Sequence, residues 1–265
     1  MAIDRQIWKY GFTLQEGVPW PCPACGRAKL RVEQCSKADK DSNAVDMAIF
    51  ERPFPSWDDQ LDKDWDSYVG AFAAVLRCGD TGCRAVVSVA GQSVQGDTWV
   101  GQGSYWVMYF VPQYFYPAIP VFSIPKGCPV NTRKEIEAAF SLYWADPGAC
   151  VNRIRSAIEL FLTYLGVKVF EIRVGKGRKS NRRIRLSLHE RIQLLEKSQP
   201  ELNQTLMAIK WLGNVGSHPG ERSKDEALDG FELLEHVLNE RFVQHKKYIS
   251  RLSKTIIRKK GRSKS

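Results

Sequence analysis

The sequence predicts an α+β fold in which a mostly β domain is followed by a helical bundle. Two observations favour it: aromatic and β-branched residues alternate in several runs of the first half, and apolar residues recur every three or four positions after residue 130. Four prolines separate the two patterns: Pro117, Pro120, Pro125 and Pro129. We therefore expect one domain at residues 1–128, a second at 129–245, and a basic tail at 246–265 that is disordered.

Length and composition agree with a globular protein of two domains. A chain of 265 residues can bury a sizeable core. It has no apolar run long enough to span a membrane and no apolar signal core at its start. Its seven cysteines are an odd number, which favours a reducing compartment over a disulfide framework. These features predict a cytoplasmic protein without a membrane partner.

The net charge of +10 is unevenly distributed along the chain. Residues 246–265 contain nine Lys or Arg and no acid, and residues 173–191 contain eight Lys or Arg against Glu190 alone. Residues 39–66, in contrast, carry nine acids and three bases. This segregation predicts a polyanion partner for the C-terminal half, and an acidic insert in the N-terminal half that does not bind it. A solvated tail and an exposed basic loop are the alternatives.

Two close cysteine pairs predict a metal site in the first domain. Cys22-Pro-Ala-Cys25 is followed by Gly26, which permits the tight turn of a zinc knuckle, and Cys78-Gly-Asp-Thr-Gly-Cys83 supplies the second pair. Four thiolates close a tetrahedral Zn²⁺ site and leave no open position, so its role would be structural in a zinc-ribbon-like segment. About fifty residues separate the pairs, more than in a compact ribbon. Buried free thiols and an iron–sulfur cluster are the alternatives.

The remaining three cysteines are less suited to ligate the metal. Cys35 is a spare that could replace one ligand, whereas Cys128 and Cys150 are expected in the core.

The aromatic run from Trp99 to Ile124 could stack nucleic-acid bases, but its alternation with valine and methionine favours a buried sheet.

The second half predicts five helices joined by short turns. Asn131 or Thr132 caps the first, which ends before Asp146-Pro147-Gly148, and the second follows from Val151 to Gly166. A basic loop then leads to a capping box at Ser187. The fourth helix extends from Pro200 to His218, and the fifth begins at a second capping box, Ser223 to Glu226. Such a pattern is typical of an antiparallel bundle.

Three polar residues near the end of the fourth helix form a candidate site. Lys210, Asn214 and His218 are four residues apart and would project from one helix face, with little side chain between them at Gly213, Gly216 and Ser217. Pro219 ends the helix, which leaves the imidazole beside the negative helix terminus and favours its charged form. A polar helix end with one histidine is the alternative. The other histidines, His189, His236 and His245, lack metal-site spacing and are expected on the surface.

Several motifs together resemble a known bacterial and phage family. They are Cys22-Pro-Ala-Cys25-Gly26, Ile124-Pro-Lys, Tyr143-Trp-Ala-Asp-Pro147, Asn152-Arg-Ile-Arg155-Ser-Ala-Ile-Glu159 and Leu212-Gly-Asn-Val-Gly-Ser-His218-Pro. The chain is similar in these motifs to the domain of unknown function 4145, which is grouped with the HEPN superfamily (higher eukaryotes and prokaryotes nucleotide-binding). The resemblance implies an all-α HEPN-like bundle, usually a homodimer, that binds RNA or acts as a metal-independent endoribonuclease in a toxin or phage-defence setting.

The resemblance also implies roles for the candidate site. The polar residue and the histidine of active members map to Asn214 and His218, whereas the arginine before the polar residue is replaced by Gly213, which leaves Lys210 as the nearest cation. In attack of a 2′-hydroxyl on phosphorus, His218 would transfer the proton, Asn214 would orient the phosphate and Lys210 would stabilise the developing charge. The residues expected to hold the nucleic-acid backbone are Arg153, Arg155, Arg178, Lys179, Arg182, Arg183 and Arg185.

Three functions remain open on this basis. The first is a ribonuclease, and the second is a non-catalytic nucleic-acid-binding module for which RNA is favoured over DNA. The third is an adaptor that binds a protein partner, because the domains it resembles often accompany restriction machinery.

Overall fold

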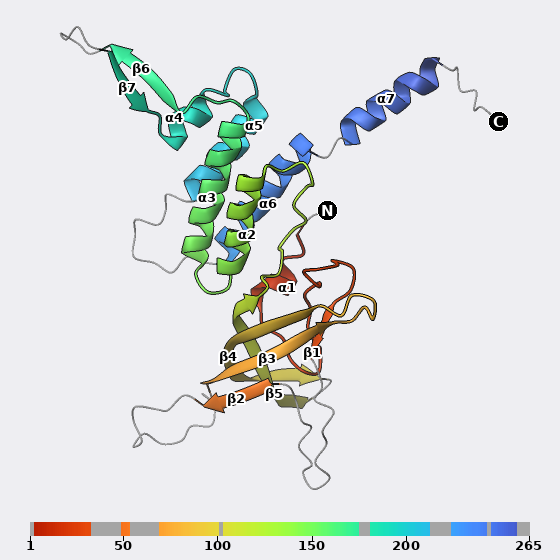
Figure 1. Ribbon diagram of the computed structural model, residues 1–265. Coiled ribbons are helices and arrows are strands. Elements are labelled where there is room, and N and C mark those ends of the chain that lie inside the picture. Colours follow the sequence, from red (N-terminus) through yellow and green to blue (C-terminus); the bar gives the residue numbers. More distant parts are fainter. Residues whose placement is uncertain are drawn as a thin grey trace. The chain divides into compact units, whose positions relative to one another are not determined.

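A computed structural model of the chain describes residues 3–32, 49–53, 69–100, 103–174, 181–212, 224–242 and 245–258. Within these ranges an antiparallel sheet comes from the first half of the chain, and helices with one small hairpin come from the second (Figure 1). The predicted α+β class is therefore confirmed. Among the described helices none is both long and apolar enough to cross a membrane.

The elements follow one another in two groups. The first group consists of α1 (Gln6–Lys9), β1 (Leu30–Val32), β2 (Ile49–Pro53), β3 (Val69–Cys78), β4 (Val86–Val100) and β5 (Gly103–Tyr116). The second consists of α2 (Val130–Leu142), α3 (Pro147–Tyr164), β6 (Phe170–Val174), β7 (Asn181–Arg185), α4 (Leu188–Gln193), α5 (Pro200–Leu212), α6 (Lys224–Phe242) and α7 (His245–Arg258).

The chain separates into two compact units. One contains Met1–Val121, Glu137–Cys150 and Ser223–Asp225; the other contains Phe122–Ile136, Val151–Arg222 and Glu226–Ser265. The end of α2 and the turn after it thus group with the sheet, because Tyr143 lies at its aromatic core. The Tyr143 hydroxyl donates a hydrogen bond of 2.9 Å to the carbonyl of Trp8, and the two rings pack edge to face.

The sheet of the first unit is antiparallel and centred on β3. β4 and then β5 follow on one side of β3, while β1 and β2 both pair with its other edge. β2 pairs with residues 70–74 of β3 and β1 with residues 76–78, so the two short strands lie end to end. On the far edge of β5, Phe12 pairs with Phe110. The N-terminal segment therefore contributes backbone partners to the edge strand of the sheet.

Aromatic side chains fill the core of this unit. Trp20 is fully buried and donates its indole N–H to the carbonyl of Ile7 at 2.7 Å. Phe12 packs against Trp20, Phe72 and Phe110 with ring centroids 5.3 to 6.0 Å apart. The predicted aromatic run is thus part of a sheet, with Phe110 inward. Three of its members, however, remain largely exposed: Trp106, Tyr114 and Tyr116.

The helical residues predicted by three-and-four spacing are buried in the second unit. Ile154, Ile158 and Leu162 of α3 are fully buried, as are the α6 residues Leu228, Phe231, Leu234 and Leu238. α3 begins earlier than predicted. Asp146 accepts a hydrogen bond of 2.8 Å from the amide of Ala149, so Asp146 acts as a helix cap and Pro147 occupies the first helical position. The predicted stop signal of α2 is therefore the start signal of α3.

Two expectations for this half were wrong. The basic segment predicted as a loop forms the antiparallel hairpin β6–β7, so this half is not all-α. Phe170, Ile172 and Val174 alternate with Glu171 and Arg173, which is a β period that the emphasis on net charge overlooked. The tail predicted to be disordered forms α7 over residues 245–258. The capping box at Ser187 and Glu190 is confirmed, whereas the one at Ser223 and the end of the fourth helix at His218 lie outside the described residues.

A buried arginine ties α4 to the C-terminal end of α3. Arg191 is 3% exposed, and its guanidinium donates to the carbonyls of Glu159 and Val167 and to the Thr163 hydroxyl, at 2.9 to 3.2 Å. Burial lowers the pKa of Arg191 from its usual value, while its charge favours the negative end of α3. Although Arg191 belongs to the basic run of the sequence, its role is structural.

We expect Arg191→Met to lower the free energy of unfolding by about 3 kcal/mol, because the buried acceptors at the end of α3 lose their donor. Urea denaturation followed by circular dichroism measures this change. The exposed Arg185→Met is the control and should change stability by less than about 0.5 kcal/mol. Equal effects of the two substitutions would contradict the structural role of Arg191.

Candidate metal centre and nucleic-acid-binding surface

Four cysteine side chains converge at one end of the sheet. The ligand atoms of Cys22, Cys25, Cys78 and Cys83 all lie within 4.8 Å of one another. The Sγ atoms of Cys22 and Cys83 are 3.8 Å apart, and those of Cys25 and Cys78 are 3.6 Å apart. The two pairs identified in the sequence therefore form one cluster despite their separation along the chain.

Strand pairing explains how the two pairs meet. The first knuckle ends in β1, which pairs with the end of β3 in a register that places Leu30 opposite Cys78. The amide of Gly79 donates to the carbonyl of Lys29 at 3.0 Å, which extends the pairing to the second knuckle. Of the described residues between the two pairs, those of β1, β2 and most of β3 belong to the sheet.

Each knuckle has a residue in the left-handed region directly after its second cysteine. Gly26 has φ 63°, and Arg84, a residue with a side chain, has φ 50°. Within the second knuckle, the Asp80 amide lies 3.4 Å from the Cys78 sulfur. A salt bridge of 2.9 Å between Arg27 and Asp80 links the two knuckles on the outside.

The electrostatics of the cluster are compatible with a bound cation. Backbone N–H groups of Ala28 and Arg27 lower the pKa of the Cys25 thiol to about 6, whereas desolvation raises the pKa of Cys78 to about 12. Four thiolates at these distances repel one another, so only some of them ionise without a positive charge between them. A divalent ion at the centre would supply that charge and deprotonate all four.

The donor set fits a single tetrahedral metal ion. A metal–sulfur distance of about 2.3 Å places tetrahedral ligands about 3.8 Å apart, close to the 3.6 and 3.8 Å observed. An iron–sulfur cluster would separate the cysteines bound to different irons by more than this. Because four sulfurs complete the coordination, a bound ion would stabilise the fold and would have no position for a substrate.

The hairpin β6–β7 carries most of the described cations proposed for nucleic-acid binding. Arg182, Arg183 and Arg185 are all exposed on β7. Arg185 lies 3.8 Å from Glu159, while no carboxylate of the described residues is in salt-bridge distance of Arg182 or Arg183. The Arg183 guanidinium lies over the Phe170 ring, 4.0 Å from its centroid. The hairpin thus combines exposed positive charge with exposed apolar surface.

The arginines of α3 and β6 have acidic neighbours. Arg153 pairs with Glu135 at 3.1 Å. Arg173 bridges Glu171 and Glu190 at 3.1 and 2.6 Å, and the pKa of Glu190 falls to about 2 through the Ser187 amide and Arg173. These carboxylates orient the arginines and also reduce the local charge. Arg155 is on the same helix as Arg153 and is half-buried.

The predicted catalytic row is only partly described. Lys210 is 9% exposed, and its ammonium lies 3.5 Å from the centroid of the Trp211 ring. It would have to leave this cation–π contact to reach a phosphate. The remaining predicted residues lie outside the described part of the chain: Asn214, His218, Arg178, Lys179 and the spare Cys35. Trp211, which is half exposed beside Lys210, was not predicted, although an exposed tryptophan next to a cation is typical of binding sites.

Comparisons with known families agree with the two-part organisation. Residues 137–259 match the family model described as a domain of unknown function (DUF4145), which confirms the resemblance of this segment to that domain. Residues 10–115 match a second one, also described as a domain of unknown function (DUF8608). The chain is similar to both. No curated protein and no solved structure matches it.

We expect the purified full-length protein to bind one metal ion per chain, as measured by elemental mass spectrometry. Cys78→Ser should lower metal affinity more than tenfold and reduce the melting temperature, since removal of one thiolate opens the coordination shell. Cys150→Ser, at a buried cysteine outside the cluster, should keep the metal. A parent protein without metal, or retention of metal by Cys78→Ser, would contradict the site.

Proposed function

We propose that this protein binds single-stranded RNA through the hairpin β6–β7, with zinc as a structural ion in its first unit. The observation that carries the RNA proposal is the row of exposed arginines on β7, directly beside the exposed side chains of Phe170 and Ile172. Arginines bind phosphates, and exposed aromatic rings stack on unpaired bases. The similarity to DUF4145, which we link to the HEPN superfamily, supports the same function.

The hairpin geometry supports binding along a strand of nucleic acid. The register places Phe170 opposite Arg185 and Ile172 opposite Arg183, so these four side chains share one face. Arg173 and Arg182 share the other face and are also cross-strand partners. Because every described position of β7 from 182 to 185 is exposed, neither face is sealed by the helices. A basic ribbon with both faces open can approach a phosphate backbone.

RNA is favoured over DNA because the hairpin surface carries both positive charge and an exposed aromatic ring. A purely electrostatic surface would bind duplex DNA equally well, because duplex phosphates are densely spaced. Phe170 is 42% exposed and lies under Arg183, an arrangement that offers a ring and a guanidinium plane to one base. Bases of a single strand can reach such a platform, whereas those of a duplex are stacked on each other.

Zinc is the ion we propose for the cysteine cluster. Zn²⁺ accepts four thiolates in a tetrahedron without a redox change, and its binding free energy would stabilise the junction of β1 with β3. Iron in the same donor set would give a coloured protein, which distinguishes the two ions.

A metal-independent endoribonuclease is the second candidate function. It is supported by the sequence order of Lys210, Asn214 and His218, of which Lys210 lies within α5, and by the histidine-based chemistry that the HEPN resemblance implies. His218 would move the proton of the 2′-hydroxyl, and Asn214 would orient the phosphate. A toxin or phage-defence setting, a homodimer and a protein partner from a defence system belong to the same proposal.

For RNA binding, we expect Arg182→Gln/Arg183→Gln to weaken the affinity of the full-length protein for labelled single-stranded RNA by about tenfold. The slope of log affinity against log salt should fall by about 0.7 for each phosphate that the variant no longer neutralises. Fluorescence anisotropy at several salt concentrations measures both quantities. Duplex DNA of the same length should bind more weakly than RNA.

The matched control removes two exposed lysines elsewhere in the second unit, Lys126→Gln/Lys134→Gln, with the same loss of charge. It should leave the affinity within about twofold of the parent. If both double variants weaken binding equally, net charge rather than the hairpin explains the affinity, and the proposed surface is wrong.

For the second candidate, we expect the parent to cleave single-stranded RNA equally well with and without EDTA. His218→Ala should lower the rate by at least a hundredfold while it binds RNA as tightly as the parent, because proton transfer is lost and the hairpin is intact. Gel analysis of end-labelled RNA measures cleavage. Cleavage that survives in His218→Ala would exclude this site, and tight binding without any cleavage would leave RNA binding as the function.

A further inference from the structure

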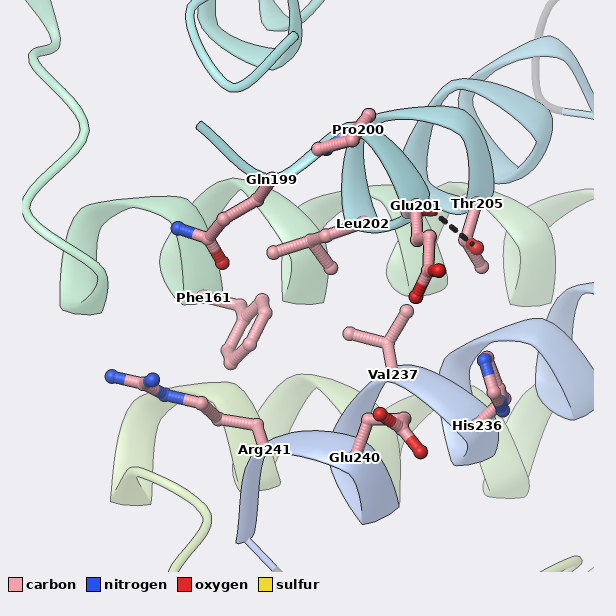
Figure 2. Close-up of a pocket in the computed structure, with 10 residues that line it drawn as sticks. All are labelled: Phe161, Gln199, Pro200, Glu201, Leu202, Thr205, His236, Val237, Glu240 and Arg241. Atoms are coloured by element: carbon pink, nitrogen blue, oxygen red, sulfur yellow. Dashed lines mark hydrogen bonds between the residues drawn. The ribbon is translucent and has the colours of Figure 1, made fainter. Parts of the chain in front are cut away.

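Two hollows lie between α5 and α6, and together we call them the α5–α6 groove. One hollow of about 410 Å³ is bounded by the start of α5 and the end of α6, with Phe161 of α3 at its base (Figure 2). A second hollow of about 570 Å³ is bounded by the end of α5, from Ala208 to Leu212, and by the first half of α6, from Asp229 to Leu233. The two hollows therefore follow the same helix pair from one end of α5 to the other.

The groove has an apolar floor and an acidic rim. Its floor is formed by Phe161, Leu202 and Val237 in the first hollow, and by Leu212 and Leu233 in the second. Figure 2 shows Glu201 and Glu240 on opposite sides of Val237. The charged residues that line the two hollows comprise four acids and one cation: Glu201, Asp229, Glu232, Glu240 and Arg241.

α7 has the complementary composition. Residues 245–258 contain five Lys or Arg and no acid. Leu252 and Ile256 lie four residues apart on one face, whereas Arg251, Lys254 and Arg258 lie about 100° or more away from Leu252 around the helix. The side chains of Leu252 and Ile256 are 41% and 51% exposed, so this apolar face is open to a partner.

The dimensions of the helix and the groove agree. α5 has 13 residues and α7 has 14, so each extends about 20 Å at 1.5 Å per residue. A helix in a groove places residues at positions i and i+4 on the apolar floor and leaves its cations beside the rim. Leu252 and Ile256 are the pair at positions i and i+4 that would face the apolar floor. Arg251, Lys254 and Arg258 are the cations that would lie beside the acidic rim.

We propose that α7 of one copy of this protein docks in the α5–α6 groove of a second copy. Its apolar face covers the floor, and its cations lie beside Glu201 and Glu240. Each copy offers both a helix and a groove, so the exchange is reciprocal and closes a two-fold symmetric dimer. Nucleic acid would match the cations of α7 but would leave the apolar face in water. The inference does not depend on RNA binding by the hairpin.

Light scattering coupled to size exclusion tests the proposal on the full-length protein at micromolar concentration. The parent should be a dimer. Leu252→Glu/Ile256→Glu should weaken dimerisation at least tenfold, because two charges would enter the apolar floor. Ile257→Glu is the matched control: this residue is 74% exposed and lies roughly 120° from the Leu252–Ile256 face, so the variant should remain a dimer.

Charge reversal then tests whether α7 binds in the α5–α6 groove. Glu201→Lys/Glu240→Lys should weaken the dimer, and the addition of Arg251→Glu/Lys254→Glu to the same chain should restore it, since opposite charges face each other again. Glu196→Lys, at an exposed acid outside the groove, is the control and should have no effect. Circular dichroism verifies that each variant is folded.

Three results would overturn the proposal: a monomeric parent, a folded Leu252→Glu/Ile256→Glu variant that stays dimeric, or charge reversal without rescue. A monomeric parent destabilised by Leu252→Glu/Ile256→Glu would instead indicate that α7 folds back into its own groove. If that variant loses RNA affinity without a change of mass, α7 contacts nucleic acid.

Discussion

The antiparallel pairing of β1 with the end of β3 is the constraint on which the first unit depends. It brings together two cysteine pairs separated by about fifty residues and places their sulfurs within 4.8 Å of one another. A contact between such distant residues carries a large cost in chain entropy, which a three-residue strand alone offsets poorly. A metal ion held by both knuckles would offset it directly. In this view the ion and the sheet stabilise each other, because β3 is both the centre of the sheet and the carrier of the second knuckle.

The second unit is stabilised in a different way. Its helices bury continuous apolar faces, and Arg191 ties the short α4 to the end of α3 through three hydrogen bonds. The strand β7 directly precedes α4, so the position of α4 determines where the basic hairpin begins. Glu190 caps α4 with Ser187 and also binds Arg173 of β6. One short helix therefore links the packed core to the exposed arginines.

The charged residues of this unit divide into groups with different tasks. Arg191 and Lys210 are both buried, and Arg191 serves local structure although it belongs to a basic stretch of the sequence. Arg182 and Arg183 are exposed beside apolar side chains and suit a phosphate backbone. The cations of α7 complement the acidic rim of the α5–α6 groove. Net charge alone would assign all of them to one polyanion, whereas burial and local partners separate them.

The sequence by itself determined the local features of this protein. The cysteine motifs, the buried faces of α3 and α6, the capping box at Ser187 and the α+β class follow from short-range spacing, because backbone geometry sets the periods of helix and strand. Charge patterning identified the basic segments but not their structure, so the hairpin β6–β7 and α7 were missed.

Only the tertiary structure decided which distant residues meet and which charges are buried. The register of β1 on β3, the contact of Arg191 with the end of α3, and the position of Lys210 over Trp211 all join groups whose proximity no local pattern encodes. The groove between α5 and α6 is likewise a property of two helices together. The physical reason is that packing depends on the sum of many long-range contacts, whereas a sequence pattern reports the preference of one segment at a time.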